Sequence, residues 1–226
     1  MTAPADVDVE FYWDPVCPWA WLTSRWVSEV VRQRGLAVDW RFISLRLLNE
    51  DRDYETEFPE GYPAVHGTGL KLLRVAAAIR AAEGPERMGA LYTRFGGDIH
   101  VRRRRKELTE QWEAGFPDYL REVGIEDRYV GAANDESWDD LLRAERDEAL
   151  SRTGPDVGTP ILSFIRDGRR YGFFGPVISR VPSGEEAVGL WDAVTHVATF
   201  DGFAELKRSI REQPQLESSL DLEGGA

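Results

Sequence analysis

The sequence predicts an α/β protein, and three features of the chain support this. Residues 7–43 show the pattern of a strand, a helix and a second strand, residues 44–155 are mostly helical in pattern, and residues 156–212 contain a strand hairpin followed by a helix. A strand–helix–strand unit pairs its strands in parallel through a right-handed crossover. We therefore expect one sheet built from both ends of the chain, with a helical region inserted between them.

The first strand and the first helix have the clearest patterns. Apolar residues at every second position across residues 7–13 predict a strand with one buried face. Apolar residues then recur at helical spacing across residues 22–31, and Gly35 is placed to end that helix as its C-cap. Pro18 suits the first helical turn, where its missing N–H leaves no hydrogen bond unmade.

Cys17, the only cysteine, lies where this strand leads into the helix. The positive end of a helix dipole stabilises a thiolate, the form that attacks disulfides and electrophiles. We therefore predict an exposed sulfur with a pKa below ~7.5, although the nearby Asp14 carboxylate opposes that shift. The alternative is a buried structural cysteine, the commoner role of a lone cysteine.

The second strand is predicted at residues 37–43, where apolar and polar residues alternate again. If the strands are parallel, residues 44–50 leave this strand at the end nearest Cys17. Asn49 is therefore a candidate polar residue of the site, and turn or capping chemistry is its alternative role.

A flap is predicted at residues 51–70, which are rich in Gly and Pro. Its aromatic residues, among them Tyr62, are placed to cover a ligand. His66, in the same segment, is expected to be a solvated loop residue. Helical patterns then follow from residue 70 to residue 151 and predict a compact insertion, with one of its helices at residues 107–123.

Two features of this insertion bear on function. The basic run at residues 102–106 is interpreted as a solvated face balanced by Glu107 and Glu110, with a docking site for an acidic substrate or partner as the alternative. His100 has two candidate roles, as a structural or as a catalytic residue. The three histidines and the cysteine show no metal-ligand spacing, and no nucleotide-binding motif occurs, so we expect no metal site.

The second half of the sheet is predicted at residues 161–165 and 171–174, joined by the strong hairpin signal Asp167-Gly168. A capping-box pattern at residues 183–186 then opens a long helix.

The C-terminal region is predicted to contain a short helix at residues 203–211. The acidic, Gly- and Ser-bearing tail at residues 213–226 is expected to be disordered.

Composition limits the classes of function. The chain has 226 residues, 42% of them hydrophobic, so it can bury a full core, and one cysteine excludes an internal disulfide. Its net charge of −12 argues against nucleic acid as the main partner. No apolar run approaches the ~20 residues of a membrane span and no secretory signal is visible, so we expect a cytoplasmic protein without a membrane partner.

The stretch Cys17-Pro18-Trp19-Ala20, between a strand and a helix, resembles the active site of thioredoxin-fold proteins of the DsbA type. The resemblance is greatest to the actinobacterial branch that includes the mycothiol-dependent nitroreductases. Similar segments occur at residues 24–26, 44–50, 157–160, 173–176 and 179–186. Those relatives typically have a second cysteine where this chain has Ala20, and a natural variant or an engineered Cys-to-Ala change would give the same sequence.

This resemblance implies a thioredoxin-like fold with a helical insertion, as in DsbA-like proteins. Residues 7–43 and 156–212 would form the thioredoxin-like domain, and residues 44–155 the insertion and flap. A cis peptide would precede Pro160, which would face the catalytic Cys17 and leave backbone groups free for an extended substrate. The expected substrate- and thiol-binding residues are Pro18, Trp19, Trp13, Asn49, Tyr62, His100, Thr159 and Pro160.

Without a second cysteine, Cys17 is restricted to monothiol chemistry, in which a mixed disulfide or a sulfenic acid is released by a thiol from solution. The resemblance implies mycothiol as a co-substrate rather than a tightly bound cofactor. An aromatic lining, with Phe174 as a further member, suits a disulfide or a flat electrophilic organic substrate.

Two alternative functions stay open. One is a thiol-assisted isomerase or transferase of the kappa-class type, whose members typically have serine at the position of Cys17. The other is a non-catalytic binding protein on the same fold. We also allow for a homodimer.

Overall fold

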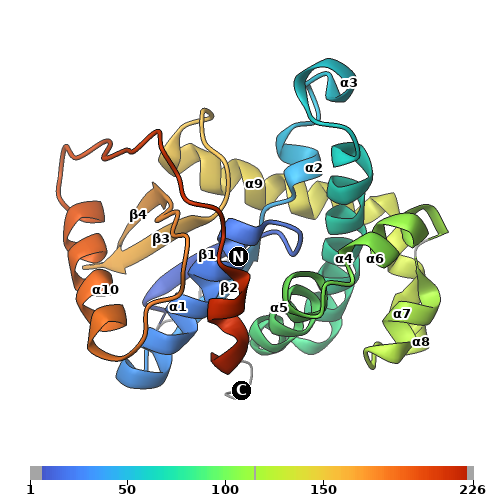
Figure 1. Cartoon of the computed structure of the whole chain (residues 1–226), viewed down its shortest axis with the longest axis horizontal. Helices are drawn as coiled ribbons and strands as arrows, with labels where there is room; N and C mark the ends of the chain where they lie inside the picture. Colours follow the sequence, from blue (N-terminus) through green and yellow to red (C-terminus); the bar gives the residue numbers. More distant parts are fainter. Residues whose placement is uncertain (1–6, 115, 223–226) are drawn as a thin grey trace.

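The computed structural model describes residues 7–114 and 116–222, and its strands form one mixed sheet (Figure 1). The strands are β1 (Val9–Trp13), β2 (Val38–Phe42), β3 (Ile161–Arg166) and β4 (Arg169–Phe174), in the order β2-β1-β3-β4. β1 is parallel to β2, with Phe11 opposite Trp40, and antiparallel to β3, with Tyr12 opposite Ile161. β3 and β4 form the predicted hairpin. The sheet therefore joins strands from both ends of the chain, as the sequence predicts.

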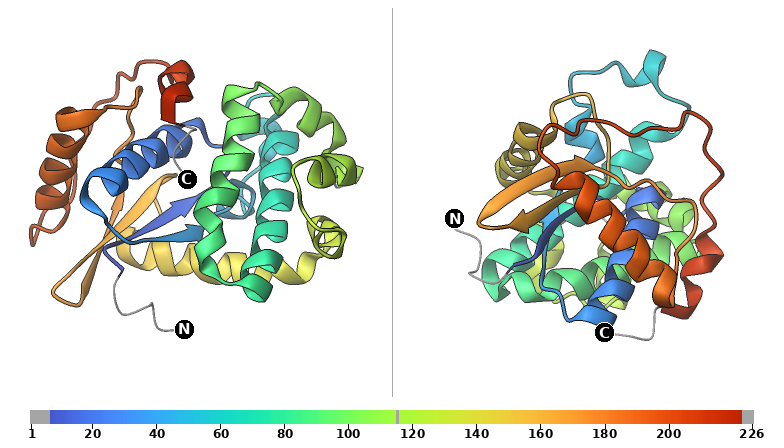
Figure 2. Two further views of the ribbon diagram at one scale, coloured as in Figure 1. Left: turned by 90° about the horizontal axis from the view of Figure 1, so that it is seen from below. Right: turned by 90° about the vertical axis from the view of Figure 1, so that its left-hand side faces the viewer.

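Helices cover both faces of this sheet. α1 (Pro18–Arg34) and α10 (Gly184–Ala198) pack together on one face, and α9 (Asp139–Thr153) contacts β2 and β4. The left view of Figure 2 shows α9 in yellow below the strands and α1 in blue above them. All of β1 is buried, so the prediction of only one buried face is wrong. Glu10 is accommodated within β1 because it forms ion pairs with Arg152 and Arg170.

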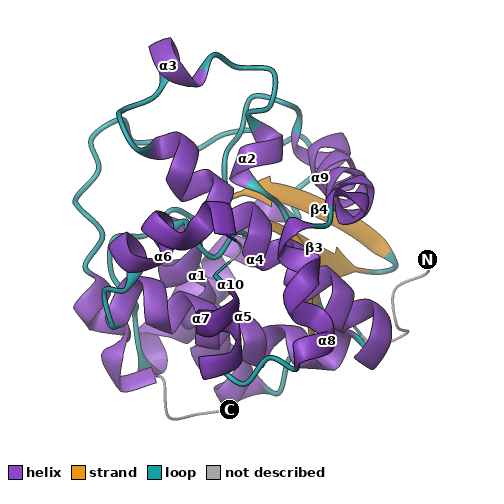
Figure 3. Cartoon of the chain, turned by 90° about the vertical axis from the view of Figure 1, so that its right-hand side faces the viewer, coloured by secondary structure: helices purple, strands orange, loops and turns teal. Residues whose placement is uncertain are grey.

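The helical insertion lies between β2 and β3 in the chain. Its helices are α2 (Leu45–Leu48), α3 (Tyr54–Glu57), α4 (Tyr62–Glu83), α5 (Met88–Gly96), α6 (Arg105–Gln111), α7 (Pro117–Glu122), α8 (Asp127–Val130) and α9. Short 3-10 or π-helical turns lie at Pro85–Arg87, Gly97–Val101, Trp112–Ala114, Gly131–Asn134 and Glu136–Trp138. Figure 3 shows α3 standing apart from the other helices. α4 contacts both α2 and α9, and α9 in turn connects the insertion to the sheet through its contacts with β2 and β4.

α4 begins at Tyr62 rather than near residue 70, so the second part of the predicted flap is helical. Gly67 and Gly69 lie inside this helix and make room for close neighbours. A Cβ on Gly67 would lie 2.7 Å from the ring of Trp112, and one on Gly69 would lie 2.5 Å from a carboxylate oxygen of Asp14. These glycines therefore serve packing rather than the turns that the sequence suggests.

The helix predicted at residues 107–123 is divided into α6 and α7. Pro117 explains the division, because proline has no N–H to bond inside a helix but fits the first turn, where it begins α7.

The capping box predicted before α10 is absent. Ser183 is the N-cap residue but its side chain makes no capping hydrogen bond, and Glu186 forms an ion pair with Arg180 instead. The N–H of Gly184 instead donates a hydrogen bond to the carboxylate of Glu29 in α1, at 3.1 Å. A tertiary contact therefore replaces the local one.

The segment after α10 also differs from the prediction. Residues 203–211 form no helix, because Leu206 and Ile210 are exposed and a short helix without a packed face is unstable in water. The predicted disorder of the tail is wrong for Leu216–Leu222, which form a 3-10 helix (η6) against α1, and residues 223–226 lie outside the described part of the chain. Ser219 anchors this helix, because its buried hydroxyl accepts a hydrogen bond from the indole N–H of Trp21 at 3.1 Å.

Candidate active site

Cys17 is placed by the end of β1 and the start of α1. It is the N-cap residue of α1, Pro18 opens the helix, and Gly35 ends it in the left-handed conformation, as the sequence predicts. The sulfur accepts a hydrogen bond from the N–H of Ala20 at 3.4 Å. The first helical turn therefore directs one of its free N–H groups at the sulfur.

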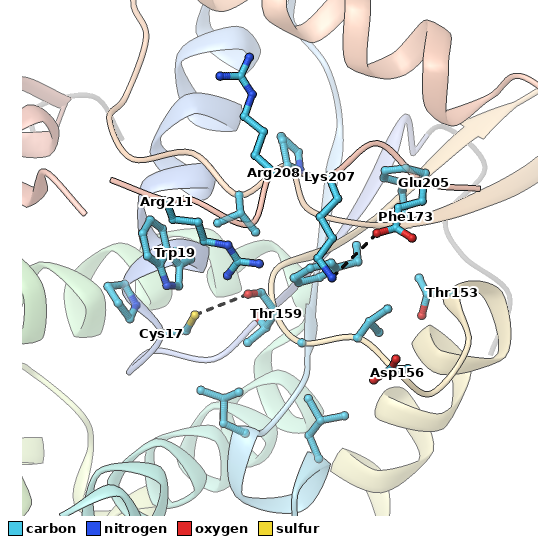
Figure 4. Close-up of a pocket in the computed structure, with 18 of the residues that line it drawn as sticks. Cys17, Trp19, Thr153, Asp156, Thr159, Phe173, Glu205, Lys207, Arg208 and Arg211 are labelled. Carbon is cyan, nitrogen blue, oxygen red and sulfur yellow. Dashed lines mark hydrogen bonds and ion pairs between the residues drawn. The ribbon is translucent and has the colours of Figure 1, made fainter. Parts of the chain in front are cut away.

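Thr159 approaches Cys17 from the other half of the sheet. The cysteine Sγ donates to the carbonyl oxygen of Thr159 at 3.7 Å, and the Thr159–Pro160 peptide is cis, as predicted. The hydroxyl of Thr159 is buried and has no hydrogen-bond partner among the described residues. Figure 4 shows the contact of Cys17 with Thr159 as a dashed line. A buried hydroxyl without a partner beside a thiol is a position where a ligand can bind.

The prediction of an exposed sulfur with a lowered pKa is wrong. Cys17 is only 5% exposed. Burial raises the pKa of its thiol to about 12, against the opposing effect of the Ala20 N–H. The Asp14 carboxyl raises that pKa further. Desolvation is stronger here than the helix terminus, so this structure holds the protonated thiol.

Asp14 ties the loop of Cys17 to the start of α2. Its carboxylate accepts hydrogen bonds from the N–H of Val16 at 2.9 Å and from the N–H of Leu45 at 2.7 Å. It is fully buried, and burial raises the pKa of the carboxyl to about 7 although both N–H groups oppose the shift. Gly69 of α4 leaves the space that this carboxylate occupies.

A cleft of about 2410 Å³ opens beside Cys17, between α1, the insertion and the segment that follows α10. Six of the predicted site residues line it, namely Cys17, Pro18, Trp19, Asn49, Tyr62 and Thr159. Phe174, predicted as part of the aromatic lining, also lines the cleft. The structure therefore brings together residues that are far apart in the sequence.

Trp13, His100 and Pro160 do not line this cleft. Trp13 is buried in the core, where its ring stacks on Tyr92 at 4.4 Å. His100 is buried as well, and its Nε2 lies 2.8 Å from the carbonyl oxygen of Pro15. Burial lowers the pKa of His100 to about 3. This histidine therefore supports the loop that carries Cys17 from behind.

Asn49 and His66 take up positions on the wall opposite α1. Asn49 is the C-cap of α2, and its side-chain amide donates to the carbonyl oxygen of Leu45 at 2.8 Å. His66 is buried in α4, with Nδ1 3.0 Å from the hydroxyl of Tyr54, so the prediction of a solvated loop residue is wrong. Burial lowers the pKa of His66 to about 4, and it is therefore neutral at pH 7.

Several cleft residues were not identified from the sequence. They include Lys207, Arg208 and Arg211. The available signal was the basic residues in a chain of net charge −12, but the pattern of residues 203–211 suggested a short helix rather than a wall of the site.

Two kinds of feature are absent from the described residues. Across residues 7–114 and 116–222, no helix has the length and apolar composition needed to cross a membrane. The same residues contain no cluster of three or more His, Cys, Asp or Glu side chains that could hold a metal ion.

Comparisons with known proteins identify relatives of this chain. The model of the Rv2466c-like family, described as mycothiol-dependent nitroreductase Rv2466c, matches residues 16–208. Uncharacterized protein Rv2286c from Mycobacterium tuberculosis is 29% identical over 205 residues, which are 88% of this chain and 81% of that protein.

Among solved structures, the chain is similar to the cytosolic disulfide reductase DsbM from Pseudomonas aeruginosa. The TM-score is 0.52 at 18% identity, over 83% of this chain and 98% of DsbM. The structure of DsbM with GSH gives 0.51 at 17%, with the same coverage. This likeness confirms the predicted thioredoxin-like fold with a helical insertion.

Proposed function

The chain belongs to the Rv2466c-like family of mycothiol-dependent nitroreductases, and from this membership we propose that Cys17 is the single nucleophile of a monothiol oxidoreductase. The family makes the chain a thiol-dependent oxidoreductase in general terms. The proposal adds the residue, the monothiol mechanism and the class of substrate, which is a disulfide or a flat electrophilic organic molecule.

The mechanism follows from the lone sulfur. The Cys17 thiol first loses its proton, and the thiolate attacks one sulfur of a disulfide, so that a mixed disulfide forms and a small thiolate leaves. A second thiolate from solution then attacks the mixed disulfide and regenerates the Cys17 thiolate, which takes up a proton. With an organic electrophile, two small thiols are oxidised to one disulfide, and the electrophile takes up the two electrons and two protons that they release.

The position of Thr159 carries this proposal. Its carbonyl oxygen accepts a hydrogen bond from the Cys17 thiol at 3.7 Å, and its buried hydroxyl has no partner in the described part of the chain. A small thiol bound between Trp19 and Thr159 could use these groups for its amide while its sulfur meets Cys17. Asn49 and Tyr62 then face the remainder of the cleft.

Mycothiol is the proposed small thiol, because the family is described by its use. It acts as a co-substrate and not as a bound cofactor. We place the reaction in the cytoplasm, since a protein with one cysteine suits a reducing compartment. A homodimer remains part of the proposal.

Intact mass after incubation with mycothiol disulfide tests the proposal. We expect one mycothiol on the protein, removed by excess mycothiol, and no adduct on Cys17→Ser. An unmodified protein would identify a non-catalytic binding protein instead.

Activity assays then separate the two enzymatic readings. Reduction of a nitroaromatic compound with mycothiol supports the oxidoreductase, whereas isomerisation without net oxidation of mycothiol supports a kappa-class type of activity. We favour the oxidoreductase, because Cys17 stands where kappa-class relatives typically have serine.

A further inference from the structure

The segment after α10 forms one wall of the cleft. We call residues 203–215 the strap, which Figure 1 shows in red between α10 and η6 and the right view of Figure 2 shows passing over the sheet. Both ends of the strap are anchored. Phe203 stacks on Phe173 of β4 at 5.8 Å, and the N–H of Gln215 donates to the carbonyl oxygen of Ser179 at 2.7 Å. The strap is therefore a defined wall of the site.

The cleft is basic although the chain is acidic. Its described lining contains six Arg or Lys residues and three Asp or Glu residues, in a protein of net charge −12. The basic residues are Arg52, Arg105, Arg152, Lys207, Arg208 and Arg211, and the acidic ones are Asp156, Glu205 and Glu212. Positive charge is thus concentrated in the cleft that contains Cys17, although the molecule as a whole is acidic.

Half of these cations are already neutralised by neighbours. Arg52 pairs with Glu57, Arg152 with Glu10, and Lys207 lies 4.0 Å from Glu205. By contrast, the side chains of Arg105, Arg208 and Arg211 have no ion pair or hydrogen bond among the described residues. Three unpaired guanidinium groups on one cleft leave it able to bind an anion.

Figure 4 shows how the strap cations lie. The guanidinium of Arg211 reaches into the pocket above Cys17 and Thr159, whereas the side chain of Arg208 points away from them. Asp156 and Glu205 lie on the other side of Thr159 from the sulfur. Among the charged residues labelled in Figure 4, Arg211 is the one whose charged group lies beside Cys17 and Thr159.

Arg105 adds a cation from the opposite wall. It belongs to the basic run that the sequence analysis singled out, and it opens α6. Its neighbours in the run are engaged elsewhere, since Arg104 pairs with Glu107 and Glu122 and Lys106 pairs with Glu110. Burial lowers the pKa of His100, and the charge of Arg105 adds to this effect, so its field reaches the interior behind Cys17.

We propose that this cleft selects organic substrates that carry a carboxylate or a comparable anion, with Arg211 as the residue that determines this specificity. The aromatic part of such a molecule would lie along Trp19 and Phe173, and its electrophilic group would face Cys17. Mycothiol carries no carboxylate, so the cations serve the second substrate rather than the thiol. The assignment of a substrate class rests on the oxidoreductase function proposed above. The attraction of anions to the cleft at Cys17 does not depend on that function.

Alkylation of the single cysteine tests anion attraction without any turnover. Iodoacetate and iodoacetamide transfer nearly the same group, but only iodoacetate is anionic. Both react with the thiolate, so the ratio of their rate constants is independent of the pKa of Cys17. We expect the iodoacetate-to-iodoacetamide ratio for Cys17 to be well above the ratio for free cysteine. It should fall toward the free-cysteine value as the salt concentration rises.

Variants of the strap locate the cation responsible. Arg211→Gln should lower the iodoacetate-to-iodoacetamide ratio about fivefold at low salt, as removal of one nearby charge predicts. Arg211→Lys should keep most of the ratio. Arg208→Gln removes the same charge from a side chain that points away and should lower the ratio less. Arg166→Gln, at the exposed end of β3 and outside the cleft lining, is the control. Equal ratios in Arg211→Gln and Arg166→Gln would overturn the proposal.

A second assay tests the substrate class. With mycothiol as reductant, para-nitrobenzoate should have a higher kcat/KM than para-nitrobenzamide, and Arg211→Gln should remove that preference mainly through KM. If both compounds are reduced equally well, the preference for anionic substrates is wrong while the oxidoreductase stands. If neither is reduced but the alkylation ratio depends on Arg211, the cleft attracts anions and the substrate assignment fails with the proposed function.

Discussion

The thiol of Cys17 donates to the carbonyl oxygen of Thr159 at 3.7 Å while it accepts from the N–H of Ala20 at 3.4 Å. The first bond needs the proton on sulfur, and the second favours its loss. Cys17 therefore lies between a group from the loop before β3 that holds the thiol and a group from α1 that stabilises the thiolate. Burial decides the balance in favour of the thiol.

This balance predicts the reactivity of Cys17 with pH. The rate of alkylation by iodoacetamide should rise with pH to a midpoint above ~8.5, the ordinary value for cysteine, because the buried thiolate is poorly solvated. Free cysteine in the same buffers gives the reference curve. A midpoint below ~7.5 would show that the helix terminus outweighs burial, as the sequence alone suggests.

Asp14→Asn should change how stability depends on pH. A carboxyl whose pKa is raised on folding contributes its full stability below its ordinary pKa of ~4, and that contribution is lost as pH rises toward the folded value of about 7. Asparagine has one acceptor oxygen for two N–H groups, so the variant should lose about 1–3 kcal/mol at low pH.

The difference in the free energy of unfolding between the parent protein and Asp14→Asn should then shrink between pH ~4.5 and ~7.5. Only the parent protein has the Asp14 carboxyl, so only the parent loses stability as that carboxyl ionises. Urea unfolding at the two pH values measures both free energies. A deficit that is constant or grows with pH would show that the carboxyl is ionised throughout.

Ala20→Cys should convert the monothiol site into a dithiol site. Position 20 follows Cys17 by one helical turn, and its N–H already contacts the sulfur. We expect an intramolecular disulfide after oxidation and a gain in thiol-coupled reduction on the order of tenfold, because the second cysteine resolves the mixed disulfide. Titration of free thiols and a disulfide reduction assay measure the two effects, with Ala20→Ser as the control. Two free thiols after oxidation would show that the first turn of α1 is placed wrongly.

Two glycines in long helices should respond oppositely to alanine. A Cβ on Gly69 would lie 2.5 Å from Asp14 Oδ1 and 3.0 Å from Val16, so Gly69→Ala should destabilise the protein by about 1–3 kcal/mol and disturb the loop of Cys17. Gly189 in α10 is exposed and has no atom within 4 Å of that position. Gly189→Ala should therefore stabilise the helix by about 0.5–1 kcal/mol. Chemical denaturation measures both, and a stabilised Gly69→Ala would mean that α4 does not pack on Asp14 as described.

Local sequence determined much of the framework. Pro18 and Gly35 mark the two ends of α1, Asp167-Gly168 turns the hairpin, and Cys17 stands at the junction of β1 and α1. Such features depend on the sterics and hydrogen bonds of a few consecutive residues, so the pattern of residue types is enough to predict them. Asn49 and Thr159 both line the cleft, but Asn49 was predicted from the expected parallel pairing of the first two strands and Thr159 from the family resemblance.

Tertiary structure decided the environment of these residues. Burial of Cys17, the packing of Trp13 in the core and the place of Gly69 inside α4 depend on atoms that are distant in the chain. The strap shows this most clearly, since the bond from Gln215 to Ser179 holds its far end and thereby brings Arg211 to the cleft. The sequence by itself determined where a nucleophile could stand. Only the assembled fold decided how strongly that sulfur is desolvated and which charges face it, because desolvation and electrostatic fields are set by every group packed nearby.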